Sequence, residues 1–190
     1  AGGGSEGKRV GFNAMRGTGG PGGEVIIPGP SGSAYAKMTR RCEGVPVFVN
    51  CQQNNGFRPR AEDIDAAITP KTKWLVLNSP NNPTGAVCTA DDMRAIAAVM
   101  RKHPHVWILC DDMYEHLIFS GAEHATIAQV APDLKDRTLT VSGISNTYAM
   151  TGWRIGFAGG PRTLIKTKVN MQGRATSVYS TVGLDAAHPA

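Results

Sequence analysis

Short runs of apolar and β-branched residues recur along this chain of 190 residues, and they constrain its fold more than any other feature. The runs occupy residues 24–28, 45–49, 74–77, 106–110, 138–141 and 155–158. Each run has the length of a buried strand, and helical patterns at 60–68, after Thr89 and at 161–169 lie between or after them. This alternation predicts an α/β fold with a mostly parallel sheet between helical layers.

The helix after Thr89 has the clearest sequence signature of the three. Thr89 occupies the N-cap position and Asp92 stands three residues later, a pairing typical of a capping box. The apolar residues that follow share one helical face and predict its buried stripe. They are Met93, Ile96, Ala97 and Met100.

Composition narrows the class of protein. A hydrophobic fraction of 41% and a charged fraction of 18% are typical of a globular chain with one main core. No run approaches the ~20 apolar residues of a membrane helix, and the N-terminus lacks a signal-peptide layout. We therefore expect a cytoplasmic protein with no membrane partner.

The net charge of +5 raises the alternative of nucleic-acid binding. The basic residues are scattered, however, and no basic run is interleaved with aromatic residues. We therefore expect no nucleic-acid partner. The four cysteines, Cys42, Cys51, Cys88 and Cys110, form no CxxC pair and predict reduced thiols, not a metal site. We expect Cys88 and Cys110 to be buried beside strands.

Three motifs follow predicted strands. The string Asn-Ser-Pro-Asn-Asn-Pro-Thr-Gly at 78–85 places two prolines and a glycine among asparagines, which predicts a rigid turn. Asp111 and Tyr114 come directly after the run at 106–110, where open α/β sheets bind ligands. The third motif, Tyr-Ala-Met-Thr-Gly-Trp-Arg-Ile-Gly at 148–156, follows a predicted polar turn at 142–147. We interpret Asp112 and Glu115 as solvated charges and His116 as a packed or surface histidine.

Together these motifs resemble those of the fold-type I pyridoxal-phosphate-dependent aminotransferases of class I/II, in particular the bacterial aspartate aminotransferase group. The resemblance runs from about residue 4 to residue 180 and implies a partial copy of the family's large cofactor-binding domain. It divides the chain into a Gly-rich segment at 1–23 with a phosphate loop, the large domain at 24–180 and a tail at 181–190. The family's N-terminal segment and small C-terminal domain are expected to be absent.

The resemblance also implies roles for individual residues. Asp111 would face the pyridine nitrogen of pyridoxal 5′-phosphate, and Asn82 and Tyr114 would contact its 3′ oxygen. Ser145, Arg154 and a helix start at Gly7 and Lys8 would hold the phosphate, since a helix N-terminus suits an anion. These side chains should converge at the carboxyl edge of the sheet, with a cis bond between Asn82 and Pro83.

Glu6 departs from the family pattern in the expected phosphate loop, and three positions depart from it around the cofactor ring. Asn146 stands where the family has the lysine that holds the cofactor as a Schiff base, and Ser31 and Gly32 replace a tyrosine and a ring-stacking tryptophan. An amide nitrogen is neither nucleophilic nor basic, because its lone pair is delocalised into the carbonyl.

The resemblance therefore implies an aspartate aminotransferase-like protein that moves an amino group between an amino acid and a 2-oxo acid. Its catalytic positions would be Asn146, Asp111 and Tyr114. Its activity would be impaired, and its cofactor would bind non-covalently. The full-length protein would be a homodimer. The alternative is a non-catalytic protein of the same fold that binds pyridoxal or pyridoxamine phosphate, or a protein partner.

Overall fold

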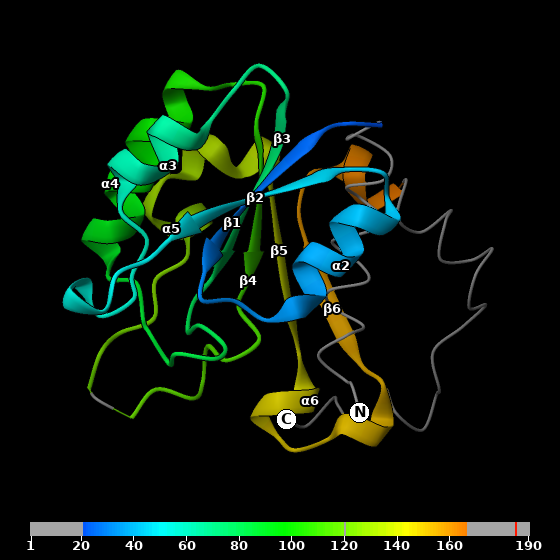
Figure 1. The fold of residues 1–190 in the computed structure, drawn as a ribbon. Helices are drawn as coiled ribbons and strands as arrows, with labels where there is room; N and C mark the ends of the chain where they lie inside the picture. Colours follow the sequence, from blue (N-terminus) through cyan, green and yellow to red (C-terminus); the bar gives the residue numbers. More distant parts are fainter. Residues whose placement is uncertain (1–20, 120, 167–184, 186–190) are drawn as a thin grey trace.

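A six-stranded sheet forms the centre of the computed structural model, which describes residues 21–119, 121–166 and 185 (Figure 1). The strands lie in the order β2-β1-β3-β4-β5-β6. Their bounds are β1 Glu24–Gly29, β2 Val45–Asn50, β3 Thr72–Asn78, β4 Trp107–Asp111, β5 Thr138–Gly143 and β6 Gly156–Gly159. The first five run parallel and only β6 pairs antiparallel, with Gly143 opposite Gly156. The mostly parallel α/β sheet expected from the sequence is confirmed.

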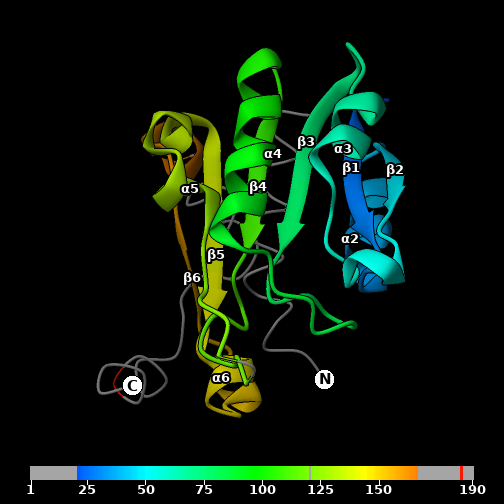
Figure 2. The same ribbon diagram turned by 90° about the vertical axis from the view of Figure 1, so that its left-hand side faces the viewer.

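Helices cover both faces of the sheet (Figures 1 and 2). They are α2 Ser33–Arg41, α3 Ala61–Ala67, α4 Ala90–Lys102, α5 Ile127–Val130 and α6 Ile144–Thr147, with 3-10 turns at Gln53–Asn55, Pro132–Arg137 and Thr151–Trp153. Helices α3, α4 and α5 lie on one face and α2 lies on the other. The sequence interpretation did not include α2, and the polar turn placed at 142–147 instead begins as the end of β5 and continues as α6.

The two faces of the sheet bury separate apolar clusters. On the face under α4, Leu75 and Ile108 pack with the helix residues Met93, Ile96 and Met100. On the other face, alternate residues of the same strands pack against α2 and Leu164. Strands buried on both faces are expected in a parallel sheet, where successive side chains point to opposite sides. Cys88 and Cys110 are buried, as the sequence predicted.

The start of α4 has the predicted cap. The hydroxyl of Thr89 accepts from the backbone N–H of Asp92, and the Asp92 carboxylate accepts from the backbone N–H of Thr89. Arg58 adds an ion pair to the same carboxylate at 2.7 Å. The bond between Asn82 and Pro83 is cis, which confirms that expectation, and the bonds before Pro30 and Pro80 are cis as well.

The end of α4 is held by the half-buried side chain of Arg137. Its Nη1 donates to the carbonyl oxygens of His103 at 2.9 Å and Val106 at 2.8 Å, and its Nη2 donates to that of Met100. One guanidinium thus satisfies two carbonyl groups that the end of a helix leaves without intrahelical partners, those of Met100 and His103, and joins them to the chain directly before β4.

We expect Arg137→Met to lower the free energy of unfolding by roughly 1.5–3 kcal/mol, the range for hydrogen bonds to a charged group. Urea denaturation measures the change. Arg101→Met is the control, because Arg101 joins Asp133 in an exposed ion pair and such pairs contribute little. Equal midpoints for the two variants would contradict this account of Arg137.

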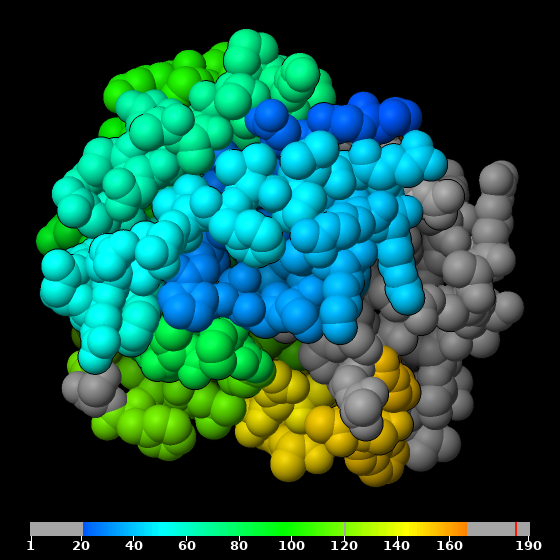
Figure 3. Space-filling model, in the orientation of Figure 1, coloured from blue at the N-terminus to red at the C-terminus, as the bar shows by residue number. Residues whose placement is uncertain are grey.

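Large apolar side chains are exposed at both edges of the sheet. Val45 and Phe48 are 48% and 58% exposed on the edge strand β2, which lies at the surface near α2 (Figure 3). Phe157 is 53% exposed on β6, at the opposite edge. Among the described residues, no helix is long and apolar enough to cross a membrane, and no group of three or more His, Cys, Asp or Glu residues could hold a metal ion.

We expect the 190-residue chain to self-associate through β2, because an exposed apolar edge strand offers unpaired backbone groups to another chain. Phe48→Lys should lower the mean sedimentation coefficient in analytical ultracentrifugation. Phe119→Lys is the matched control, since Phe119 is 93% exposed but lies outside the sheet. A parent chain that sediments as a monomer at every concentration would refute the expectation.

Candidate cofactor site

Most of the residues singled out in the sequence lie at one edge of the sheet. The arrowheads of β3, β4 and β5 point to the same end of the molecule, where α6 also lies (Figure 2). Asn82 follows β3, while Asp111 ends β4 and Tyr114 follows it. Ser145 and Asn146 lie in α6, directly after β5, and Arg154 precedes β6. The sheet therefore gathers residues that are up to 72 positions apart in sequence (82 to 154).

Asn82 and Tyr114 are in direct contact. The Asn82 amide Nδ2 donates to the Tyr114 hydroxyl at 2.8 Å. Asn78 holds the two loops together, because its Oδ1 accepts from the Asn82 backbone N–H at 3.0 Å and its Nδ2 donates to the Asp111 backbone carbonyl at 2.9 Å. One amide side chain at the end of β3 thus fixes Asn82 relative to the end of β4.

Asp111 is fully buried and accepts a hydrogen bond from the hydroxyl of Tyr35 in α2. The Met113 backbone N–H approaches the other carboxylate oxygen at 3.4 Å. Burial raises the pKa of Tyr35 well above its usual value, and the neighbouring Asp111 raises it further. Tyr35 therefore remains a neutral hydrogen-bond donor to the Asp111 carboxyl group.

The connection between β5 and β6 carries the remaining residues. The Ser145 hydroxyl is buried, and it has no hydrogen-bond partner among the described residues. Asn146 is half-buried next to it. Arg154 is exposed at φ +60°, and its Nη1 lies 3.4 Å from the Thr151 carbonyl oxygen. Gly7 and Lys8, the expected phosphate loop, lie outside the described residues.

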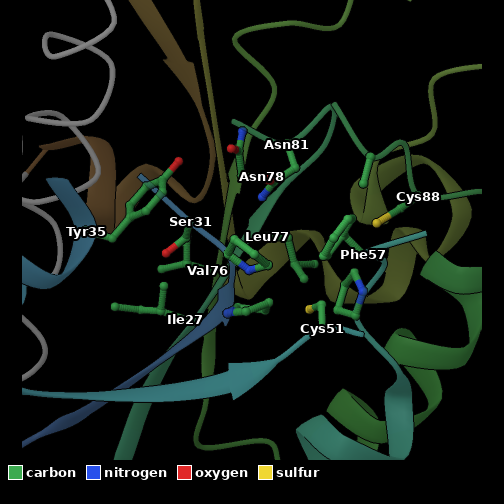
Figure 4. Close-up of a pocket in the computed structure, with 14 residues that line it drawn as sticks. Ile27, Ser31, Tyr35, Cys51, Phe57, Val76, Leu77, Asn78, Asn81 and Cys88 are labelled. Atoms are coloured by element: carbon green, nitrogen blue, oxygen red, sulfur yellow. The ribbon is translucent and has the colours of Figure 1, made fainter. Parts of the chain in front are cut away.

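The two replaced positions, Ser31 and Gly32, lie between β1 and α2. Ser31 lines a small pocket with Tyr35, Asn78 and the buried Cys51 and Cys88 (Figure 4). Burial raises the pKa of Cys88 to about 12, so its thiol stays protonated at neutral pH.

Gly32 lies beside Asn82. A Cβ at Gly32 would come no closer than 3.9 Å to the Asn82 carbonyl oxygen, which leaves room for a side chain there.

The interpretation of Asp112 as a solvated charge was wrong, and Glu115 is only partly exposed to solvent. Asp112 is 3% exposed and lies 3.7 Å from Nε2 of His124. Burial raises the pKa of the Asp112 carboxyl, and the carboxylate in turn raises the pKa of His124. Glu115 is partly buried and accepts from the Ser142 hydroxyl at 2.7 Å. Asp112 is thus buried, whereas the Glu115 side chain is hydrogen-bonded but 28% exposed.

Sequence reasoning also missed Tyr35 and Asn78 as parts of this site. Asn78 is the first residue of the motif at 78–85, and its place at the end of a strand is the signal that could have identified it. Tyr35 lies in the helix that was not foreseen, and its contact with Asp111 spans 76 residues.

Comparison with known proteins agrees with the fold and the motifs. The family of class I and II aminotransferases matches residues 2–190. An aspartate aminotransferase of Rhizobium meliloti (strain 1021) is 53% identical over 92% of this chain and 43% of its own length. A probable aspartate/prephenate aminotransferase of Rhizobium leguminosarum bv. phaseoli is 48% identical over 97% of this chain and 46% of its own.

Solved structures give the same picture. The aspartate aminotransferase of Rhizobium meliloti superposes with a TM-score of 0.92 and 50% identity, covering 96% of this chain and 45% of that structure. The aspartate aminotransferase of Thermus thermophilus with maleate superposes with a TM-score of 0.89 and 40% identity. This match covers 95% of this chain and 46% of that structure. The chain thus spans less than half the length of these relatives. On sequence and fold alike, the chain belongs to the class I and II aminotransferases, whose cofactor is pyridoxal phosphate.

Proposed function

We propose that this chain forms the cofactor-binding part of an aspartate aminotransferase-like protein and binds pyridoxal 5′-phosphate without a covalent bond. Its substrates would be an amino acid and a 2-oxo acid, and the complete protein would act as a homodimer. The observation that carries the proposal is the network joining Asp111, Asn82 and Tyr114 at one sheet edge.

The described residues fit this cofactor. Asp111 offers a buried carboxylate to a protonated ring nitrogen, and the Tyr114 and Asn82 side chains offer polar atoms to a ring oxygen. The buried Ser145 hydroxyl is a donor with no partner among the described residues, an arrangement that a bound phosphate oxygen would resolve. Arg154 can add a charged fork for the same phosphate.

The cofactor, when bound, supplies an electron sink that stabilises negative charge at the substrate Cα. The protein's part is to hold the ring and to move a proton at that carbon. Asn146 cannot move it, because an amide is not basic, and losing a positioned general base costs about 10²–10⁴-fold in rate. We therefore propose that transamination is impaired in this chain.

Asn146→Lys provides the direct test. We expect the variant to bind pyridoxal phosphate covalently, because the lysine amine can attack the aldehyde carbon. Borohydride reduction and peptide mass spectrometry would place the added mass on residue 146, while the parent would show only a reversible change in visible absorbance.

Asn146→Gln is the matched control, since it lengthens the side chain without adding an amine. A folded Asn146→Lys variant left unlabelled at position 146 would refute the proposed site. A parent with no spectral change would favour the alternative of a protein-partner role.

Gly32→Trp tests whether a side chain at position 32 would stack on the cofactor ring. We expect pyridoxal phosphate to bind about 2- to 13-fold more tightly, because aromatic stacking contributes about 0.5–1.5 kcal/mol. Quenching of the added tryptophan would report the distance to the ring. Ser33→Trp is the control, since it adds the same ring one residue further along, at the start of α2. Equal affinity in both variants would contradict this placement of Gly32.

A further inference from the structure

Two separate turns carry the residues of the proposed site. The turn after β4 holds Asp111 and Tyr114, and the turn after β5 holds Ser145 and Asn146. The two turns must keep a fixed spacing, because side chains from both are needed around one ligand. Backbone pairing of β4 with β5 ends at Asp111 and Val141, before either turn begins. Beyond that pair, the Asp112 backbone N–H donates to the Val141 carbonyl oxygen at 2.9 Å, and side-chain contacts must fix the rest of the two turns.

Ser142 and Glu115 make that contact. The hydroxyl of Ser142 donates to Oε1 of Glu115 at 2.7 Å. Ser142 is 6% exposed, so the bond is shielded from water on the serine side. Hydrogen bonds to an ionised acceptor are roughly twice as strong as those between neutral groups, and burial limits competition by solvent.

The surrounding contacts tie each residue to one of the two turns, since Glu115 lies in the turn after β4 and Ser142 lies in β5 directly before the turn that follows it. The Glu115 backbone N–H donates to the Asp112 carbonyl at 3.0 Å, which closes the turn that contains Tyr114. Ser142 precedes Gly143, where an added Cβ would lie 3.0 Å from the Ile155 carbonyl oxygen. A shift of the turn after β4 would therefore displace Glu115, and a shift of the turn after β5 would displace Ser142.

Two weaker contacts join the same two segments of the chain. The Ser142 hydroxyl also lies 3.4 Å from the Asp112 carbonyl oxygen, and the Thr147 hydroxyl lies 3.4 Å from that of Met113. Both distances are long for hydrogen bonds that start from a hydroxyl. The bond between Ser142 and Glu115 is therefore the short side-chain link between the two turns in the described structure.

We propose that Ser142 and Glu115 are positioning residues that act through Tyr114. Their hydrogen bond fixes the turn after β4 against the turn after β5, and it thereby holds the Tyr114 hydroxyl where Asn82 donates to it. The importance of Tyr114 for a ligand rests on the proposed function, whereas the link itself does not.

Fluorine NMR of the 190-residue chain with 3-fluorotyrosine tests the link without any ligand. We expect Ser142→Ala and Glu115→Ala to shift the Tyr114 resonance, which Tyr114→Phe identifies by its loss. The double variant should shift it no further than either single variant, because both remove the same bond. Glu115→Gln should restore most of the parental shift, since its amide oxygen still accepts.

Ser33→Ala is the control, because Ser33 is an exposed serine at the start of α2. The Tyr35 resonance serves as an internal reference on the other side of Asp111. A Tyr114 resonance that is unchanged in Glu115→Ala, or shifts that add in the double variant, would overturn the proposal.

Ligand binding separates this proposal from the proposed function. Added pyridoxal phosphate should bind Ser142→Ala about fivefold more weakly than the parent, the effect of losing one net hydrogen bond. If the parent itself shows no binding, the proposed function fails while the Tyr114 result still decides the link. If parent and variants bind equally, the link does not serve the site, and the positioning role is overturned.

Discussion

The side-chain amide of Asn78 is the contact on which the candidate site depends. Asn78 is the last residue of β3. Its amide donates to the carbonyl oxygens of Asp111 and Pro80 and accepts from the backbone N–H of Asn82. A parallel sheet brings strand ends together but leaves the loops beyond them without backbone pairing. Asn78 supplies that pairing with one rigid group, because a planar amide can donate and accept in fixed directions. Removing the Asn78 side chain would leave Asp111 buried, but Asn82 would lose the hydrogen bond that fixes it relative to the sheet.

The strands and the cap of α4 could be predicted because their signals are local. Six apolar runs gave strand positions to within a few residues, and Thr89 and Asp92 form the expected capping box. The environment of Asp112 could not be predicted, since its burial depends on His124 and on the path of a loop. The contact between Tyr35 and Asp111 needed an unforeseen helix and a sheet order that no local pattern encodes. Motifs thus identified residues that surround the site, while the contacts that orient those residues depend on the assembled sheet.

The three departures from the family pattern around the cofactor ring lie in a framework that is otherwise kept. Asn146, Ser31 and Gly32 change the groups that would touch the faces and the reactive carbon of a bound ring. Asp111, Asn82 and Tyr114, which would hold its edge, remain in one hydrogen-bonded network. In the proposed site, binding and bond-making would be carried by different residues, so one could be lost while the other stayed. Such a division is expected wherever a cofactor supplies the reactive group and the protein supplies its orientation.

The antiparallel pairing of β6 has a consequence for the order in which the chain assembles. β5 and β6 are joined by the 12 residues from Ile144 to Ile155, whereas Tyr35 and Asp111 are 76 residues apart. Closing a short loop costs less chain entropy than closing a long one, and contacts distant in sequence form slowly. The hairpin that carries Ser145 and Arg154 can therefore form while the first strands are still unpaired. The contact between Tyr35 and Asp111, in contrast, requires α2 to pack near the end of β4 and closes a far longer stretch of chain.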